Sequence, residues 1–322
     1  MASTKDLKKR ISTVKNTQQT TRAMKMVSAA KLRRAQDSIQ NQRPYAKRIS
    51  ELIKILASQI EEKNIPSLVR KKKEIEIAAS KMGSWPEGWP GSLEVDSKIV
   101  LVVLTSDRGL CGAFNGNIIK ATQRWLTSYQ SEGKSLENLK FIFIGKRGYD
   151  FFKNKGIQVH AFYPELGGKV TFAKAKTLAD NLIKLYLSEG VDEVKFIYNE
   201  FKNAVTQKVV VEDFLPVLKE EPIEAVSTVS APVNPMPDIL VEPSLDEVMN
   251  ELLTRNFSIQ AFRILLESQA GEHGARMSAM ENATKNAGEM IRKLTLQYNK
   301  QRQAGITKEL LEIIAGSESQ KS

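Results

Sequence analysis

The stretch Met277-Ser-Ala-Met-Glu-Asn-Ala-Thr-Lys-Asn-Ala-Gly-Glu-Met-Ile-Arg-Lys-Leu-Thr-Leu-Gln-Tyr298 decides the fold. Its apolar residues recur at alternating steps of three and four, the spacing that lines one face of a helix packed along another helix. No proline occurs from Ser244 to Gly316, so one helix can span that range, on the order of 100 Å at 1.5 Å per residue. Ile306, Leu310 and Ile313 continue the stripe. A helix of this length needs a partner.

The other end of the chain offers that partner. Residues 4–63 also have helical spacing. Two long helices with one apolar stripe each bury those stripes most economically as an antiparallel coiled coil. Two separate surface helices on a globular core are a poorer alternative, because a core cannot easily cover roughly 60 to 70 residues of helix in line. The seam is expected to include Ile49, Ile53 and Leu56 of the first helix and Ile291 and Leu294 of the last.

The first helix has two irregular places. Small polar residues from Asn16 to Thr21 interrupt the apolar stripe, which resumes with Met24, Val27 and Leu32 facing the seam while Lys25 points elsewhere. Further on, Pro44 is expected to kink the helix or to divide it in two.

Positive charge is concentrated at the start of the chain. The first 50 residues hold thirteen of the 48 Lys and Arg residues but two of the 37 Asp and Glu residues, so this stretch accounts for the whole formal charge of +11. Such a helix requires an acidic partner, which could be nucleic acid, anionic lipid or an acidic protein surface.

Composition excludes several classes of protein. The 322 residues contain no run of 18 apolar residues, and the polar, basic start is not a secretory signal. Cys111 is the single cysteine, so an intrachain disulfide is impossible. The two histidines, His160 and His273, are too few for a histidine-rich metal site.

The middle of the chain has the alternating strand and helix pattern of a Rossmann-like α/β domain with a mostly parallel sheet. Strands are expected at 99–104, 139–144, 157–162, 194–198 and 205–214, with helices after the first strand and at 171–188. The expected organisation is a coiled-coil helix at 1–66, a surface connection at 67–97, the α/β domain at 98–214, a proline-rich connector at 215–243, a second coiled-coil helix at 244–316 and a tail at 317–322. In the surface connection, Trp85 and Trp89 either bind a partner or fold back on their own loop.

The loop after the first strand is where an α/β fold normally binds its ligand. Here that loop, Arg108-Gly-Leu-Cys-Gly-Ala-Phe-Asn115, lacks the glycine and lysine spacing of a phosphate-binding loop. Cys111 as a nucleophile would need a histidine beside it, and a small buried thiol is the better interpretation. We therefore predict no catalytic residue, no cofactor site and no metal site.

Four segments, in this order, resemble the gamma subunit of F-type ATP synthases. They are Thr21-Arg-Ala-Met-Lys-Met-Val-Ser-Ala-Ala-Lys-Leu-Arg-Arg-Ala-Gln36, Ser106-Asp-Arg-Gly-Leu-Cys-Gly-Ala-Phe-Asn115, Ala275-Arg-Met-Ser-Ala-Met-Glu-Asn-Ala-Thr-Lys-Asn-Ala287 and Tyr298-Asn-Lys-Gln-Arg-Gln-Ala-Gly-Ile-Thr-Lys-Glu-Leu310. The resemblance extends from about Lys5 to Gly316.

The resemblance implies a rotating shaft without a catalytic site, driven by proton or sodium flow. The implied partners are the alpha and beta subunits of the catalytic hexamer, the epsilon subunit and the c-ring. Nucleic acid is not among them, and membrane contact occurs only through the complex. The implied location is peripheral, at the cytoplasmic face of a bacterial inner membrane or at a thylakoid membrane.

The resemblance also assigns residues to those partners. It implies a hydrophobic collar around Ile313 and Ile314 at the tip, and a place near the c-ring foot for Glu242. It implies beta-subunit contacts for Met24, Lys25, Arg276, Arg302, Gln303, Thr307 and Glu312.

Two other classes stay open at this stage. The basic helix is compatible with a nucleic-acid binder, although it lacks interleaved aromatic residues and no base-reading module is present. An enzyme built on the α/β domain is the third possibility, and it would require nucleotide binding by the isolated chain.

Overall fold

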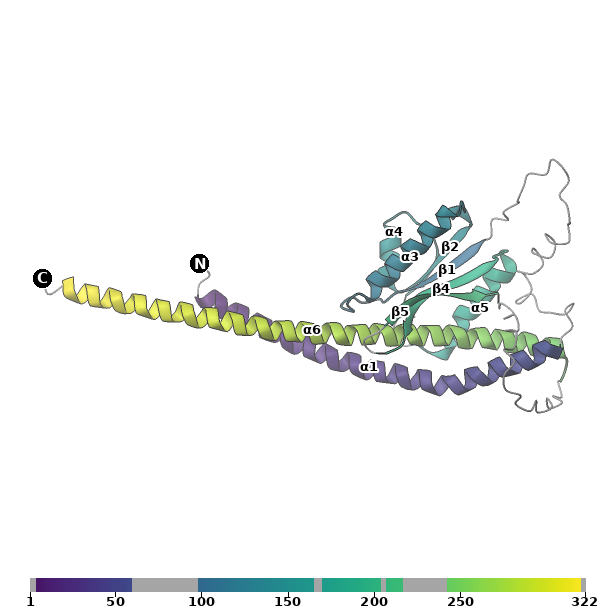
Figure 1. Cartoon of the computed structure of the whole chain (residues 1–322), viewed down its shortest axis with the longest axis horizontal. Coiled ribbons are helices and arrows are strands. Elements are labelled where there is room, and N and C mark those ends of the chain that lie inside the picture. The colour runs from purple at the N-terminus through teal and green to yellow at the C-terminus, as the bar shows by residue number, and fades with distance from the viewer. Residues whose placement is uncertain (1–3, 60–97, 165–169, 204–206, 217–241, 320–322) are drawn as a thin grey trace, which may run out of the picture.

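The computed structural model describes residues 4–59, 98–164, 170–203, 207–216 and 242–319. Two long helices and one α/β domain make up the molecule (Figure 1). The predicted surface connection with Trp85 and Trp89, most of the proline-rich connector and the last residues of the tail lie outside the described residues.

The two long helices confirm the predicted antiparallel coiled coil. Helix α1 spans Thr4–Gln59 and helix α6 spans Leu245–Ser319. They run side by side in opposite directions, with the α/β domain at the end where α6 begins (Figure 1). At 1.5 Å per residue α6 is roughly 110 Å long and α1 roughly 85 Å long.

Buried positions on α1 repeat in steps of three and four over most of its length. Leu7, Ser28, Leu32, Ala35, Ile39, Ile49 and Leu56 are buried, with half-buried residues completing the repeat between them. This continuous stripe packs on α6, where Met280 and Ala287 are buried at matching levels. The heptad spacing therefore sets which face of each helix meets the other.

The polar segment from Asn16 to Thr21 does not interrupt the coiled coil. The hydroxyl groups of Thr21 and Thr284 lie 2.8 Å apart across the seam, and Gln18 Nε2 donates to the Thr284 carbonyl over 3.4 Å. A Cβ added to Gly288 would lie 3.0 Å from Gln18 Nε2, so the glycine leaves room for this amide. These residues form a polar layer within the apolar seam.

Two predictions about the faces of α1 are wrong: Lys25 does not point away from α6 but pairs with Glu281 on it, and Val27 is on the wrong face. Val27 does not face the seam: it is 56% exposed, and the neighbouring Ser28 is buried in its place because the three-and-four repeat passes through Thr21, Lys25 and Ser28. Pro44 does not divide the helix, which continues through it. Of the two outcomes expected at Pro44, division of the helix is therefore wrong, whereas a bend is in line with the bowed course of α1 (Figure 1).

The α/β domain contains one five-stranded sheet in the order β3-β2-β1-β4-β5. Strands β1 to β4 are parallel, and the edge strand β5 pairs antiparallel to β4. The mostly parallel sheet is therefore confirmed. The strands are β1 Ile99–Leu104, β2 Leu139–Ile144, β3 Val159–Tyr163, β4 Glu193–Phe201 and β5 Gln207–Leu215. The remaining helices are α3 Phe114–Ser131, η2 Leu136–Asn138, α4 Lys146–Lys153 and α5 Phe172–Ser188.

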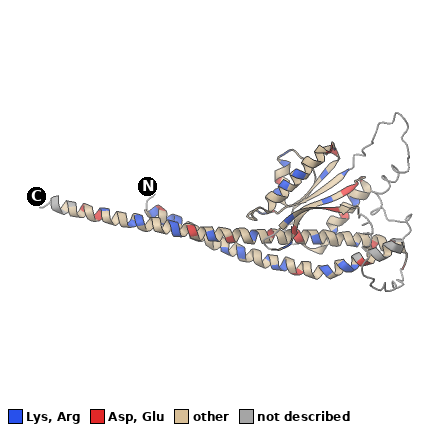
Figure 2. Cartoon of the chain, in the orientation of Figure 1, with Lys and Arg blue, Asp and Glu red and all other residues tan. Residues whose placement is uncertain are grey.

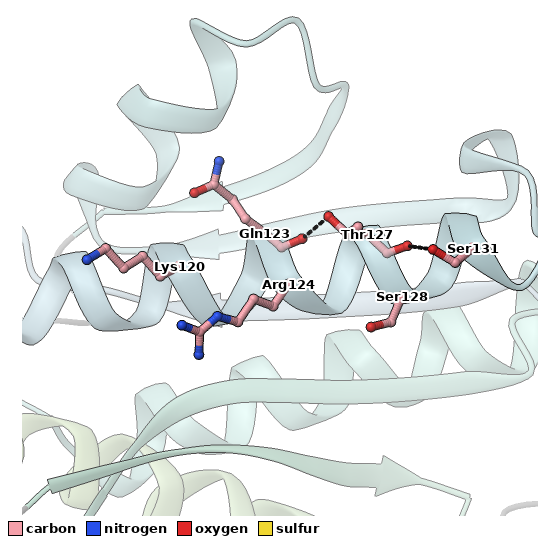
Figure 3. A pocket seen from close by; sticks show the side chains of 6 residues that line it. All are labelled: Lys120, Gln123, Arg124, Thr127, Ser128 and Ser131. Carbon is pink, nitrogen blue, oxygen red and sulfur yellow. Dashed lines mark hydrogen bonds between the residues drawn. The ribbon is translucent and has the colours of Figure 1, made fainter.

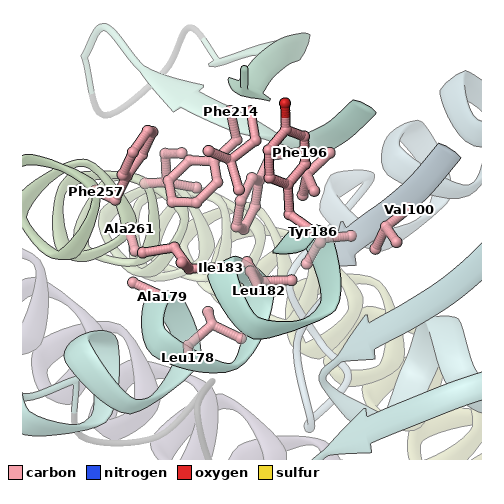
Figure 4. Packing of buried hydrophobic residues seen from close by; sticks show 14 of the residues in the cluster. Val100, Leu178, Ala179, Leu182, Ile183, Tyr186, Phe196, Phe214, Phe257 and Ala261 are labelled. Carbon is pink, nitrogen blue, oxygen red and sulfur yellow. The ribbon is translucent and has the colours of Figure 1, made fainter. Parts of the chain in front are cut away.

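The two faces of the sheet have different covers. Alternate β1 residues such as Leu101 and Val103 pack with Phe114 of α3 and Phe152 of α4. The opposite face packs against α5 and against the first part of α6, where Phe257 and neighbouring apolar residues join the core (Figure 4). One helix thus serves both the coiled coil and the core of the domain.

Candidate functional site

The edge of the sheet where parallel α/β folds bind ligands is closed here. Thr105, directly after β1, donates its hydroxyl to the Gly145 carbonyl over 3.2 Å and accepts from Gly148 N over 2.9 Å. Gly145 has φ 92° and a Cβ there would lie 2.0 Å from the Thr105 carbonyl oxygen, so only glycine fits. Ser268, Gln269 and Glu272 of α6 cover this edge and leave a cavity of about 10 Å³, enough for one water molecule at most.

The N-terminus of α4, a natural anion-binding position at the same edge, is filled by the chain itself. Asp107 Oδ1 accepts a hydrogen bond from Lys146 N over 3.0 Å, and the Ser106 carbonyl accepts from Arg147 N over 3.2 Å. The carboxylate of Asp107 therefore takes the place that a ligand phosphate would occupy in a nucleotide-binding relative of this fold.

Cys111 is buried, 2% exposed, in contact with polar groups of its own loop. Its sulfur lies 3.2 Å from Asn115 Nδ2 and 3.6 Å from Ser106 Oγ. His160 is exposed near the start of β3, at the end of the sheet opposite to the Cys111 loop, so it is not placed to activate this thiol. The thiol is a packing element of the loop.

The hollow along α3 offers no convergent chemistry. It is wide and open, about 830 Å³, and its described lining residues include two cations, Lys120 and Arg124, but no carboxylate and no histidine. The hydroxyls of Thr127 and Ser131 donate to helix carbonyls one turn earlier (Figure 3). These side chains are bonded within their own helix and point to no common atom.

Beta-contact residues predicted for the middle of the coiled coil are largely engaged within the chain. Lys25 Nζ lies 2.7 Å from Glu281 Oε1, in an ion pair between α1 and α6, and Met24 is half-buried. Both partners of that ion pair are more than one-third exposed, so water screens it strongly. Figure 2 shows the other basic residues distributed along α1.

Arg276 is buried, at 8% exposure, where α6 passes the loop after β1. Its Nη1 lies 2.7 Å from Glu272 Oε1, and its Nη2 donates to the carbonyls of Arg108 (3.4 Å) and Gly109 (3.3 Å). Burial raises the pKa of the Glu272 carboxyl, against the attraction of Arg276. Burial and the nearby Arg276 lower the pKa of His273 to about 4, so its imidazole is neutral at pH 7. This cluster attaches the loop to the coiled coil.

The far end of α6 extends past the start of α1 (Figure 1). The Thr21–Thr284 contact fixes the register of the two helices, and this register places the start of α1 level with Arg302. Every described side chain of α6 from Arg302 to Ile314 is exposed. Gln303, Thr307 and Glu312 lie on this projecting segment, which we define as residues 302–319. Its exposed apolar residues are Ile306, Leu310, Leu311, Ile313 and Ile314, from 48% to 68% exposed.

The predicted site residues thus fall in three separate places. Glu242 is exposed just before α6, whose first turn is capped by Ser244 accepting from Glu247 N over 3.3 Å. The second group lies midway along the coil and the third on the projecting segment. Of the seam residues, Ile49 and Leu56 are buried, while Ile53, Ile291 and Leu294 are half-buried.

Sequence reasoning missed two sets of polar residues. The first is the layer of Gln18, Thr21 and Thr284, which looked like an interruption of the stripe. The second is a set of two ion pairs on α6, the buried pair of Glu272 with Arg276 and the half-buried pair of Arg263 with Glu267. The four-residue spacing of both pairs was a usable signal. Their partners in the α/β domain left no local signal.

Together these features define the class of protein. The molecule is an elongated coiled-coil stalk subunit with an α/β domain whose ligand edge is closed and a terminal helical segment exposed for another chain. None of the described helices is long and apolar enough to cross a membrane.

Comparison with known proteins identifies the family. The family model described as ATP synthase matches residues 3–319. The ATP synthase gamma chain of Bdellovibrio bacteriovorus is 42% identical over the full length of both chains, and that of Geobacter metallireducens is 41% identical, also over the full length of both. A solved structure of the central stalk and c-ring of the Tetrahymena thermophila mitochondrial ATP synthase is similar, with TM-score 0.55 and 26% identity, covering 82% of this chain and 98% of that one. The chain belongs to the ATP synthase gamma-chain family, and as a member of it is a non-catalytic rotor subunit.

Proposed function

We propose that this protein is the central shaft of an ATP synthase driven by proton or sodium flow. The c-ring and the epsilon subunit hold its foot, and the coiled coil turns inside a hexamer of alpha and beta subunits. Because the shaft is not symmetric about its axis, each beta subunit meets a different face in turn, and its affinity for nucleotide changes with that face. In this proposal the nucleotides bind to the other subunits and not to the shaft.

The observation that carries this proposal is the projecting segment. A helix with five exposed large apolar residues on residues 302–319 is unusual for a chain that acts alone. A surrounding apolar collar on other subunits would cover it. Apolar contact is nondirectional, so no single hydrogen bond would hold Ile313 and Ile314 at one angle and the segment could rotate within the collar.

Beta-subunit contacts are proposed at two levels of the shaft. Arg302, Gln303, Thr307 and Glu312 are exposed near the collar. About 40 Å toward the foot, by the helix rise, the second level contains Met24, Lys25 and Arg276. Since Arg276 is buried, we assign its effect on beta to the Arg108–Gly109 loop that it holds.

The foot is proposed at the opposite end. Exposed Glu242 lies at the end of the proline-rich connector, just before α6, so it is near the c-ring in this arrangement. We propose the same division of the chain as the sequence indicates: shaft helices at 1–66 and 244–316, a surface connection at 67–97, the α/β domain at 98–214, the connector of the foot at 215–243 and a tail at 317–322. The bacterial relatives support a peripheral position on the cytoplasmic face of an inner membrane.

Reconstitution tests this proposal. The chain is expressed with the alpha and beta subunits of its own organism, and the mass of the purified assembly is measured. We expect one copy of this chain per hexamer and ATP hydrolysis that turns a bead attached to the α/β domain. A chain that stays apart from the hexamer and shifts DNA mobility in a salt-dependent way would overturn the proposal in favour of a nucleic-acid binder.

A further inference from the structure

A second ionic cluster joins α6 to the edge of the sheet, away from the loop that Arg276 holds. Arg263 of α6 donates from Nη1 to the Tyr198 hydroxyl over 3.2 Å and to Glu267 Oε1 over 3.3 Å. Its Nη2 pairs with Glu212 of β5. The hydroxyl of Tyr198, on β4, donates to Glu212 Oε2 over 2.5 Å. One guanidinium therefore connects α6, β4 and β5, and we refer to these four residues as the Arg263 cluster.

This cluster is costly for a purely stabilising contact. Tyr198 is 1% exposed, and Glu267 Oε2 is buried without a hydrogen-bond partner. Burial also raises the pKa of the Glu267 carboxyl, although Arg263 acts in the opposite direction. The Arg263 and Glu212 side chains are 34% and 31% exposed, and an ion pair that water reaches contributes little to stability, whereas its charge-assisted hydrogen bonds fix one relative geometry. The cluster is thus better suited to orientation than to stability.

The position of β5 in the chain explains why a fixed geometry between β5 and α6 would matter. As the edge strand, β5 is paired only to β4 within the described sheet. It ends at Leu215, where the connector of the proposed foot begins, and the connector returns to the chain at Glu242, just before α6. A force applied to the foot would therefore reach both β5 and the beginning of α6.

Contacts of two kinds, apolar and ionic, join β5 to α6 within the described residues. The rings of Phe214 and Phe257 lie 5.4 Å apart in the apolar core (Figure 4), and such a contact permits sliding because it is nondirectional. The pairing of Arg263 with Glu212 and Tyr198 cannot slide without losing hydrogen bonds to a charged group. By the helix rise, Arg263 lies roughly 27 Å along α6 from its start, well into the shaft.

We propose that Arg263 is a positioning residue that clamps β5 to the shaft helix, so that the α/β domain and the coiled coil turn as one body. This inference rests on the proposed function as a rotor. Arg263 contacts no nucleotide and acts through the geometry of the joint between foot and shaft.

The test uses the whole synthase in inverted membrane vesicles. Arg263→Gln removes the charge, and Arg255→Gln is the matched control, because exposed Arg255 lies on the same helix but packs over the ring of Tyr45 on α1. Hydrogen exchange of the peptide 207–215 and the number of ions pumped per ATP hydrolysed are measured. We expect roughly tenfold faster exchange in β5 for Arg263→Gln and no change for Arg255→Gln. Pumping per ATP should fall for Arg263→Gln and stay unchanged for Arg255→Gln.

The number of ions pumped per ATP distinguishes a positioning role of Arg263 from a role in folding alone. A purely structural loss would lower the amount of assembled enzyme without changing that ratio. Glu212→Gln keeps an acceptor for Tyr198 and should give the same effect, and the double variant should be no worse than either single variant. If Arg263→Gln assembles poorly, Glu212→Gln carries the measurement.

Wild-type exchange and pumping in both variants would overturn the inference. If instead the wild-type vesicles show no ATP-driven pumping that requires this chain, the proposed function fails. The exchange comparison then still decides whether Arg263 holds β5.

Discussion

At the scale of single residues, polar side chains of types that bind ligands in other proteins are bonded here to the chain itself. Asp107, Arg276 and Thr105 are residue types that hold phosphate, metal or nucleophile in other α/β proteins. Here each is bonded to the chain's own backbone: Asp107 at the start of α4, Arg276 at the carbonyls of residues 108 and 109, and Thr105 at the close approach of Gly145. These groups hold the α/β domain in shape and join it to the coil.

His273 provides a prediction at this scale. Its pKa is about 4 in the folded chain against an ordinary value of 6.5, so the unfolded chain takes up a proton first as pH falls. The contribution of His273 to the free energy of unfolding is therefore fully present above pH 6.5 and is lost as the pH falls from 6.5 to 4. At pH 5.5 the free energy of unfolding has fallen by about 1.4 kcal/mol for this reason. Glu272, whose pKa is raised, acts in the opposite direction at lower pH.

A comparison of variants isolates the imidazole. His273→Gln should lose about 1.4 kcal/mol less stability than the wild-type chain between pH 7.5 and 5.5, measured by urea unfolding. His160→Gln, at an exposed histidine, is the control and should follow the wild type. Identical pH dependence in the wild type and His273→Gln would show that the buried histidine is not linked to folding.

At the scale of elements, the coiled coil provides the second prediction. Leu294 is half-buried in the seam, level with Ile11 in the register set by Thr21 and Thr284, whereas Leu296 on the same helix is 70% exposed. Leu294→Asp should destabilise the coil by about 2 kcal/mol, because a charge replaces partly buried apolar surface. Leu296→Asp should have little effect.

Circular dichroism during thermal unfolding measures both variants. Ile53→Asp, at a half-buried position near the other end of the coil, is expected to resemble Leu294→Asp. Unchanged helicity and melting in Leu294→Asp and Ile53→Asp would count against the packing of α1 on α6. A similar loss in Leu296→Asp would show that the effect comes from helix propensity and not from the seam.

The polar layer explains why the coil keeps one register. Apolar residues at steps of three and four pair almost equally well after a shift of one heptad, but Gln18, Thr21 and Thr284 find hydrogen-bond partners in one alignment. The layer replaces apolar contact in the middle of the seam, and a shifted register would leave its polar side chains without these hydrogen-bond partners.

At the scale of the whole molecule, the projecting segment provides the third prediction. Deletion of the residues after Gln303 removes side chains that are exposed along residues 304–314, so the melting temperature of the α/β domain should not change. Torque or assembly with the hexamer should weaken, because the surface that the collar would hold is gone. Normal ATP synthesis by an intact complex of the truncated chain would contradict this role of the tip.

Much of the fold was readable from the chain, and the reason differs between its parts. The strands β1 and β2 were predicted at their observed bounds, since unbroken aliphatic runs such as Ile99–Leu104 are typical of buried parallel strands. Val27 was misplaced because a hydrophobic side chain was preferred to Ser28, although the heptad repeat selects position 28. Pro44 does not divide α1, because an exposed proline can be accommodated in a bent helix.

Local spacing and composition are enough to predict the helices, the strands, their apolar faces and the concentration of positive charge in α1. That α6 forms one face of the domain's core as well as half of the coil emerges only when the chain is folded. The tertiary structure alone also reveals that Arg263 and Arg276 bind the α/β domain. Those contacts join residues far apart in the chain, from Glu212 to Arg263 and from Arg108 to Arg276, and no local pattern specifies which distant partner a buried charge will meet.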